Sequence, residues 1–124
     1  MSVKLTEEKF VATLTTTNSA VTTILAYPVT SSCIFFADVV ISARDLVTND
    51  ASIFARNYAH RSTAGSSTVF VGAGSFNAPF LAEDDTSWDV SNVNAVNGVN
   101  VSVQGDATNP TSWALWLTVY KMEP

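Results

Sequence analysis

The stretch that decides the fold is Asn97-Gly98-Val99-Asn100-Val101-Ser102-Val103-Gln104. Its Asn-Gly pair is a strong hairpin signal, because both residues tolerate the positive φ angles of a type I′ turn. Val99, Val101 and Val103 then alternate with polar residues, which is the period of a half-buried strand. The stretch therefore predicts a hairpin whose first strand is residues 88 to 96 and whose second strand begins at Val99.

The C-terminal segment, residues 112 to 121, carries large apolar side chains on both faces of a predicted strand. Trp113 and Leu117 point to one side, and Trp116 and Tyr120 point to the other, since successive side chains of a strand alternate. Aromatic side chains on both faces indicate that both are covered. We expect the cover on the second face to be the other sheet or another subunit.

Strand and turn signals continue back to Phe10, and branched and aromatic residues dominate the apolar positions. About eight short strands with regular turns predict an all-β fold, an antiparallel β-sandwich of jelly-roll type. Residues 1 to 9 are charged, and Thr6 is placed to cap a helical turn there. We expect a short N-terminal arm over residues 1–9 and one sandwich domain over residues 10–124. The remaining predicted strands are residues 10–17, 20–27, 32–44, 51–61 and 68–73.

The composition excludes several functional classes. Of 124 residues, 47% are hydrophobic and 14% are charged, which argues against intrinsic disorder. The net charge of -5 comes without a basic stripe, so we expect no nucleic-acid partner. No Lys/Arg cluster or long apolar run suggests a membrane partner, and nothing resembles a signal peptide.

No catalytic constellation stands out. His60 is the only histidine, and no Gly-x-Ser-x-Gly elbow accompanies it, so a surface or loop histidine is the preferred interpretation. Cys33 is the only cysteine and lies in an apolar run, where a small buried hydrophobe is expected. We therefore expect no enzyme and no cofactor.

The densest acidic cluster is Glu83, Asp84, Asp85 and Asp89. Carboxylates in this number are weak candidates for a calcium site, because hard cations take several oxygen ligands. The spacing does not match an EF-hand loop. A solvated turn, in which an Asp side chain bonds its own backbone, is the preferred interpretation, and no metal is predicted.

Three C-terminal segments carry a resemblance to a known family: Glu83-Asp84-Asp85-Thr86-Ser87-Trp88-Asp89, a Gly-x-x-Val-x-Val-x-Gly strand from Gly98 to Gly105, and a closing Trp strand from Ser112 to Tyr120. With the Thr-rich opening strands of residues 15–28, they resemble a β-sandwich domain of tailed-bacteriophage virion proteins, of the capsid decoration or tail-fibre type. The resemblance implies a structural role in a virion, and it carries over no catalytic residue.

For a short chain that begins at Met1, we expect a capsid decoration (cement) protein that binds the outer shell and stabilises it without catalysis. A tail-fibre or receptor-binding tip protein is the alternative, and a carbohydrate-binding module is the second alternative. The expected partners are other copies, as a homo-oligomer with a trimer as the best guess, and the major capsid protein or tail proteins. The expected location is the virion, after synthesis in the bacterial host cytoplasm. The interface candidates are Trp116, Tyr120, Thr6 and Phe10.

Overall fold

The computed structural model describes residues 3–76, 80–84 and 87–124. Within these ranges the chain forms nine strands and no helix, which confirms the predicted all-β class. The strands are β1 (Lys4–Thr16), β2 (Thr22–Pro28), β3 (Cys33–Asp45), β4 (Ala51–Ser62), β5 (Val69–Phe76), β6 (Phe80–Glu83), β7 (Asp89–Ala95), β8 (Gly98–Gln104) and β9 (Thr111–Glu123).

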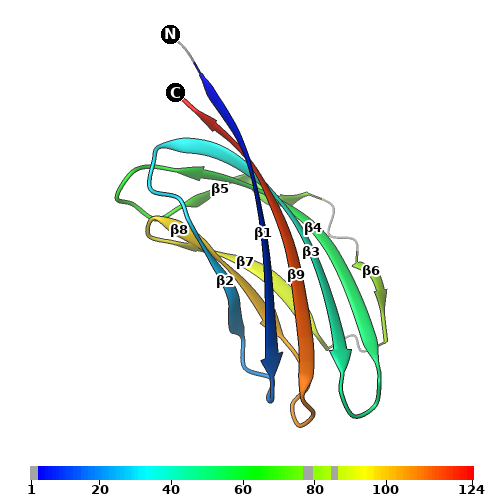
Figure 1. Cartoon of the computed structure of the whole chain (residues 1–124). Coiled ribbons are helices and arrows are strands. Elements are labelled where there is room, and N and C mark those ends of the chain that lie inside the picture. Colours follow the sequence, from blue (N-terminus) through cyan, green and yellow to red (C-terminus); the bar gives the residue numbers. More distant parts are fainter. Residues whose placement is uncertain (1–2, 77–79, 85–86) are drawn as a thin grey trace.

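The strands form two antiparallel sheets that pack face to face as a sandwich (Figure 1). The large sheet has the order β1-β9-β3-β4-β5, and β6 also pairs with β4. The small sheet has the order β2-β8-β7. The first strand of the chain therefore lies beside the last one, and the pairing runs from Lys4 opposite Glu123 to Thr16 opposite Thr111.

The core lies between the sheets and follows from strand alternation. Every second residue of β3 from Cys33 to Asp45 is buried, and so is every second residue of β9 from Thr111 to Val119. The small sheet supplies buried valines from β8. Burial of these branched and aromatic side chains provides the main stabilisation. The largest apolar side chains that are fully buried in the core are Phe35, Phe54, Ile41, Trp113 and Leu115.

The hairpin between β7 and β8 is present, but its loop is shifted from the prediction by one residue. Ala95 pairs with Gly98, so the two loop residues are Val96 and Asn97. Asn97 has a positive φ of 55°, whereas Gly98 does not lie in the positive region. A Cβ at Gly98 would lie 2.6 Å from the carbonyl oxygen of Tyr27. The glycine is therefore required for close packing against β2 rather than for the turn.

The predicted N-terminal arm is not separate from the sheet, because Lys4 to Lys9 are the first half of β1. The helical turn at Thr6 was a wrong prediction for the same reason. Inside the sandwich, Lys121 Nζ lies 3.0 Å from Glu8 Oε1, and the Tyr27 hydroxyl donates to the same oxygen at 3.3 Å. Burial raises the pKa of Tyr27 to about 12. These contacts join β1, β9 and β2, which explains why charged residues belong to a strand.

The segment before the acidic turn also differs from the prediction. The predicted strand of residues 68–73 is too short, because β5 continues to Phe76. A short strand, β6, then pairs with β4 from Ser52 opposite Glu83 to Phe54 opposite Phe80. Residues 77–79 lie outside the described part of the chain.

The Trp113 side chain lies in the core and is 1% exposed. Its indole N–H donates a hydrogen bond to Thr16 Oγ1 at 3.0 Å. Trp113→Ala should lower the free energy of unfolding by about 3–5 kcal/mol, because it leaves a large cavity. Urea denaturation measures this change. Measured on the monomeric chain, Trp116→Ala, on the opposite face of the same strand, is the matched control and should change stability by less than about 1 kcal/mol. Equal losses in the two variants would contradict the assigned facing.

Candidate functional site

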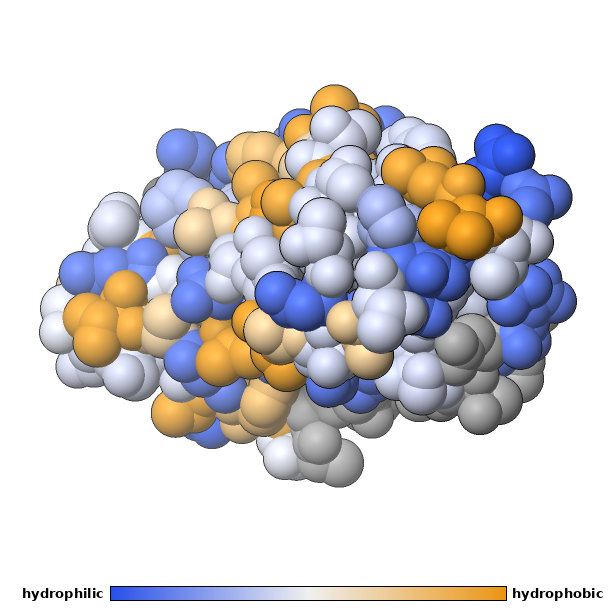
Figure 2. All heavy atoms as spheres, turned by 90° about the horizontal axis from the view of Figure 1, so that it is seen from below, coloured by the Kyte–Doolittle hydropathy of each residue, from blue (hydrophilic) through white to orange (hydrophobic). Residues whose placement is uncertain are grey.

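Single exposed apolar side chains such as Val21, Val93 and Val96 are scattered over the described surface, and two settings bring several of them together. At the lower end of the sandwich, the β3–β4 loop exposes Leu46 (56%) and Val47 (69%). Asp45 holds this loop, because its carboxylate accepts the backbone N–H groups of Val47 and Thr48 at 2.8 and 3.0 Å. The Thr48 bond is the main reason that the pKa of Asp45 is lowered. From below, apolar and hydrophilic residues are interspersed, with no single continuous apolar area (Figure 2).

The second setting is the outer face, defined here as the side chains of β1, β9, β3 and β4 that point away from the small sheet. The pairing of the four strands aligns these side chains in rows across the sheet. One row is Val11–Trp116–Val40–Ala55, in which Trp116 is 51% exposed and Val11 is 75% exposed. We call this row the tryptophan row.

Two further rows make a second apolar area toward the end where the termini lie. They contain Leu5–Met122–Ile34–Arg61 and Glu7–Tyr120–Phe36–Ala59. Between this area and the tryptophan row lies one polar row, Lys9–Thr118–Asp38–Asn57. The outer face thus has two apolar areas separated by a single line of polar side chains.

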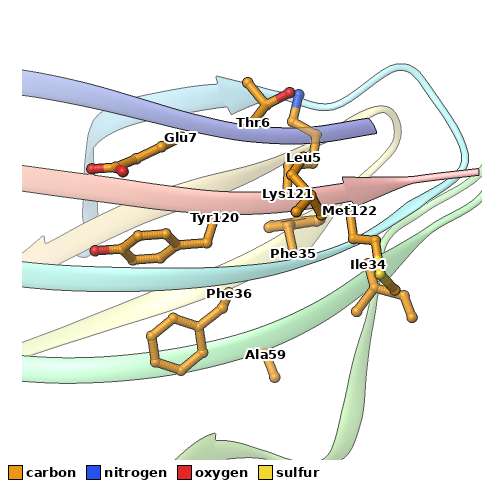
Figure 3. A pocket seen from close by; sticks show the side chains of 10 residues that line it. All are labelled: Leu5, Thr6, Glu7, Ile34, Phe35, Phe36, Ala59, Tyr120, Lys121 and Met122. Carbon is orange, nitrogen blue, oxygen red and sulfur yellow. The ribbon is translucent and has the colours of Figure 1, made fainter. Parts of the chain in front are cut away.

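The apolar area near the termini contains a shallow hollow of about 480 Å³. Four neighbouring strands contribute to it, and Tyr120 and Phe36 lie side by side over β9 and β3 (Figure 3). Charged lining groups are Glu7 and Lys121. Lys121 is already paired with Glu8, so the hollow offers contact area rather than a set of groups for acid–base chemistry.

Of the four predicted interface candidates, the structure brings two together. Trp116 and Tyr120 (46% exposed) both lie on the outer face. Thr6 is half-buried, and its hydroxyl has no hydrogen-bond partner among the described residues. Phe10 packs against the core and makes an edge-on contact with Tyr27 at 5.1 Å. An interface role for any of the four stays a prediction. The other residues of the outer face, on β1, β3 and β4, were missed by sequence reasoning.

The prediction of a surface or loop His60 was wrong, because its side chain is fully buried between the sheets. The ring stacks on Phe35 at 4.9 Å and lies 4.8 Å from Phe70. Its Nδ1 is 3.0 Å from Asn94 Oδ1, and its Nε2 is 3.4 Å from Asn92 Nδ2. Burial lowers the pKa of His60, so the imidazole is neutral near pH 7.

Where the structure describes it, the acidic segment forms hydrogen bonds with backbone groups. Asp84 Oδ2 accepts the N–H of Ala51 at 2.9 Å, and the Asp84 N–H donates to the Ala51 carbonyl. Asp89 lies 3.4 Å from Arg56 and accepts the N–H of its neighbour Val90. Asp85 lies outside the described residues, and among the rest no three His, Cys, Asp or Glu side chains gather as a metal site. Glu83 is half-buried at the end of β6.

Comparisons with known proteins give limited likeness. No protein-family model matches the sequence, and no curated protein matches it. In the described part of the chain there is no helix long and apolar enough to cross a membrane.

Three solved structures are similar in fold. The tailspike protein of Acinetobacter baumannii phage AM24 matches 95% of this chain with a TM-score of 0.40 and 12% identity, and 26% of the tailspike is covered. The tailspike protein of Acinetobacter phage vB_ApiP_P1 matches 94%, with a TM-score of 0.35 and 8% identity, and 22% of it is covered. A protein from disulfide-linked Bacillus endospore appendages matches 97%, with a TM-score of 0.38 and 13% identity, and 90% of it is covered. The chain thus spans about a quarter of either tailspike protein.

Burial of His60 makes stability depend on pH. The unfolded chain has the ordinary imidazole pKa of about 6.5, and the folded chain has a lower one, so the unfolded chain binds the proton more readily. Stability should therefore fall as the pH drops below about 6.5 and continue to fall down to the folded pKa. His60→Phe keeps an aromatic ring beside Phe35 but cannot titrate.

The measurement is the melting temperature at about pH 7.5 and about pH 5 for both proteins. The wild type should lose more than His60→Phe over this interval, whatever the two absolute stabilities are. Parallel losses would show that His60 does not titrate with unfolding.

Proposed function

We propose that the chain is a structural subunit of a bacteriophage virion that acts by burying its outer face against neighbouring subunits, without catalysis. The sequence resemblance to virion β-sandwich domains supplies the context.

The observation that carries the proposal is the exposure of apolar side chains in ordered rows on one side of the large sheet. Leu5, Val11, Trp116, Tyr120 and Met122 are each 45% exposed or more, and all five lie on this side. Apolar areas that stay exposed on a monomer mark an interaction site, because their contact with water is unfavourable. A face built from four hydrogen-bonded strands is also rigid, so it loses little conformational entropy when it is covered.

The chemistry of the described side chains supports a role without catalysis. The one imidazole is buried and fully engaged by aromatic and amide neighbours. Asp84 and Asp89 bind backbone N–H groups or Arg56. These groups are therefore used to hold strands together.

Incorporation into virions tests the proposal. Trp116→Glu places a charge in the centre of the tryptophan row and should abolish incorporation while leaving the fold intact. The matched control is Val93→Glu, at a position that is 45% exposed on β7 of the small sheet. The copy number per purified particle is the measurement. Normal incorporation of Trp116→Glu would contradict a packing role for the outer face.

Immunogold labelling of purified particles separates the two kinds of virion role. Label on the shell would identify a capsid decoration protein, and label on the tail would identify a fibre or tip protein. Absence from the particle would overturn the proposal. Binding on a glycan array that is lost in Trp116→Ala would instead favour a carbohydrate-binding module.

A further inference from the structure

We propose that the occupant of the outer face is a second copy of this chain, packed face to face about a two-fold axis that runs parallel to the strands. This inference rests on the proposed function and names the partner at the same surface. Two observations carry it, which are the order of the rows along the strands and the placement of the charges within the polar row.

An axis parallel to the strands superposes each row on the same row of the second copy. It exchanges β1 with β4 and β9 with β3, because the order across the face is β1-β9-β3-β4. The tryptophan row then lies against the tryptophan row, and the area around Tyr120 lies against its equivalent. On the two central strands apolar side chains thus meet apolar ones, with Trp116 against Val40 and Tyr120 against Phe36, in the aligned geometry that two packed sheets adopt. At the edges of the face, Leu5 meets Arg61 of the second copy and Glu7 meets its Ala59.

The polar row becomes complementary to itself in this arrangement. Lys9 on β1 faces Asn57 of the second copy and lies diagonally beside its Asp38. The symmetry makes this contact twice. Among the described residues of one chain, Lys9 makes an exposed ion pair of 3.8 Å with Glu7, and such pairs contribute little to stability. The Lys9 ammonium is therefore available to a partner.

The Asp38 carboxylate is held in place by a neighbouring side chain, which orients it for the same contact. In the orientation that satisfies both groups of the Asn57 side-chain amide, its nitrogen donates to Asp38 Oδ1 at 2.9 Å. One carboxylate oxygen is thereby held, and the other is left for the lysine of the second copy. An axis perpendicular to the strands through this row would instead set Lys9 against Lys9 and Asp38 against Asp38, which like-charge repulsion disfavours.

The size of the face is sufficient for a stable pair. Four strands about 4.8 Å apart and about eleven residues long at about 3.3 Å per residue cover roughly 700 Å². Each partner in a standard-size interface contributes roughly 800 Å². The contact is isologous, so it closes at two copies, whereas the trimer expected from the sequence would need a contact between two different surfaces.

Charge exchange tests the pairing directly. Lys9→Asp alone places two carboxylates together in the pair, and Asp38→Lys alone places two ammonium groups together. Each single variant should self-associate about tenfold more weakly or worse. Mixed together, they should form a heterodimer, because the Asp at position 9 then meets the Lys at position 38 and the native Lys9 meets the native Asp38. An effect inside one chain cannot produce this rescue.

Light scattering coupled to gel filtration gives the mass of each species, and native mass spectrometry identifies the heterodimer by mass. The wild type should have twice the mass of the 13.2 kDa chain. A monomeric or trimeric wild type, or single variants that fail to pair with each other, would overturn the proposal. Circular dichroism of each variant confirms folding before its mass is interpreted.

The two proposals can fail separately. A wild-type chain that is monomeric in solution but loses incorporation into virions upon Trp116→Glu would overturn the pairing and leave the structural role standing. A chain that pairs as described but is absent from virions would overturn the structural role and leave the pairing standing.

Discussion

The structure depends on one constraint, which is that a strand sends successive side chains to opposite faces of its sheet. β3 pairs along its whole length with β4 on one side and with β9 on the other, and these three strands define both faces of the large sheet. Within the described ranges only one face is covered, by a sheet of half as many strands. The inner side chains form the core, and the outer ones are exposed in rows because they share the same register.

The inner face is not uniformly apolar, and its polar part joins the two sheets. Arg56 of β4 donates to the carbonyl of Val90 at 3.1 Å and lies near Asp89 on β7. Four residues further along β4, the inward His60 ring contacts Asn94, whose side-chain oxygen also accepts a hydrogen bond from the Thr68 hydroxyl. Directed bonds of this kind fix how the sheets sit on each other, which valine packing alone specifies weakly.

Local patterns in the sequence predict much of this arrangement, and long-range pairing explains the rest. Apolar alternation places β3 and β9 within one or two residues, since the inner side of both is buried almost throughout. Alternation does not identify Lys4 to Lys9 as a strand, because their charges are accommodated only by pairing with the other end of the chain. His60 continues the inward phase of Phe54, but its neighbours Asn92 and Asn94 are more than thirty positions away. The two-sided final strand indicates that its second face is covered by a partner, yet only the register of four strands reveals the rows on that face.

The pairing of the first strand with the last also sets an order of events during synthesis. The β1–β9 pairing links residues separated by almost the whole chain, and such contacts form slowly because a long loop must close first. On a ribosome, β1 emerges first and has no partner until β9 follows. During that interval its edge is open to other chains, as unpaired strand edges are prone to aggregate. Polar residues alternate along β1, including Glu7 and Lys9. They disfavour association of the unpaired strand with other chains before β9 is available.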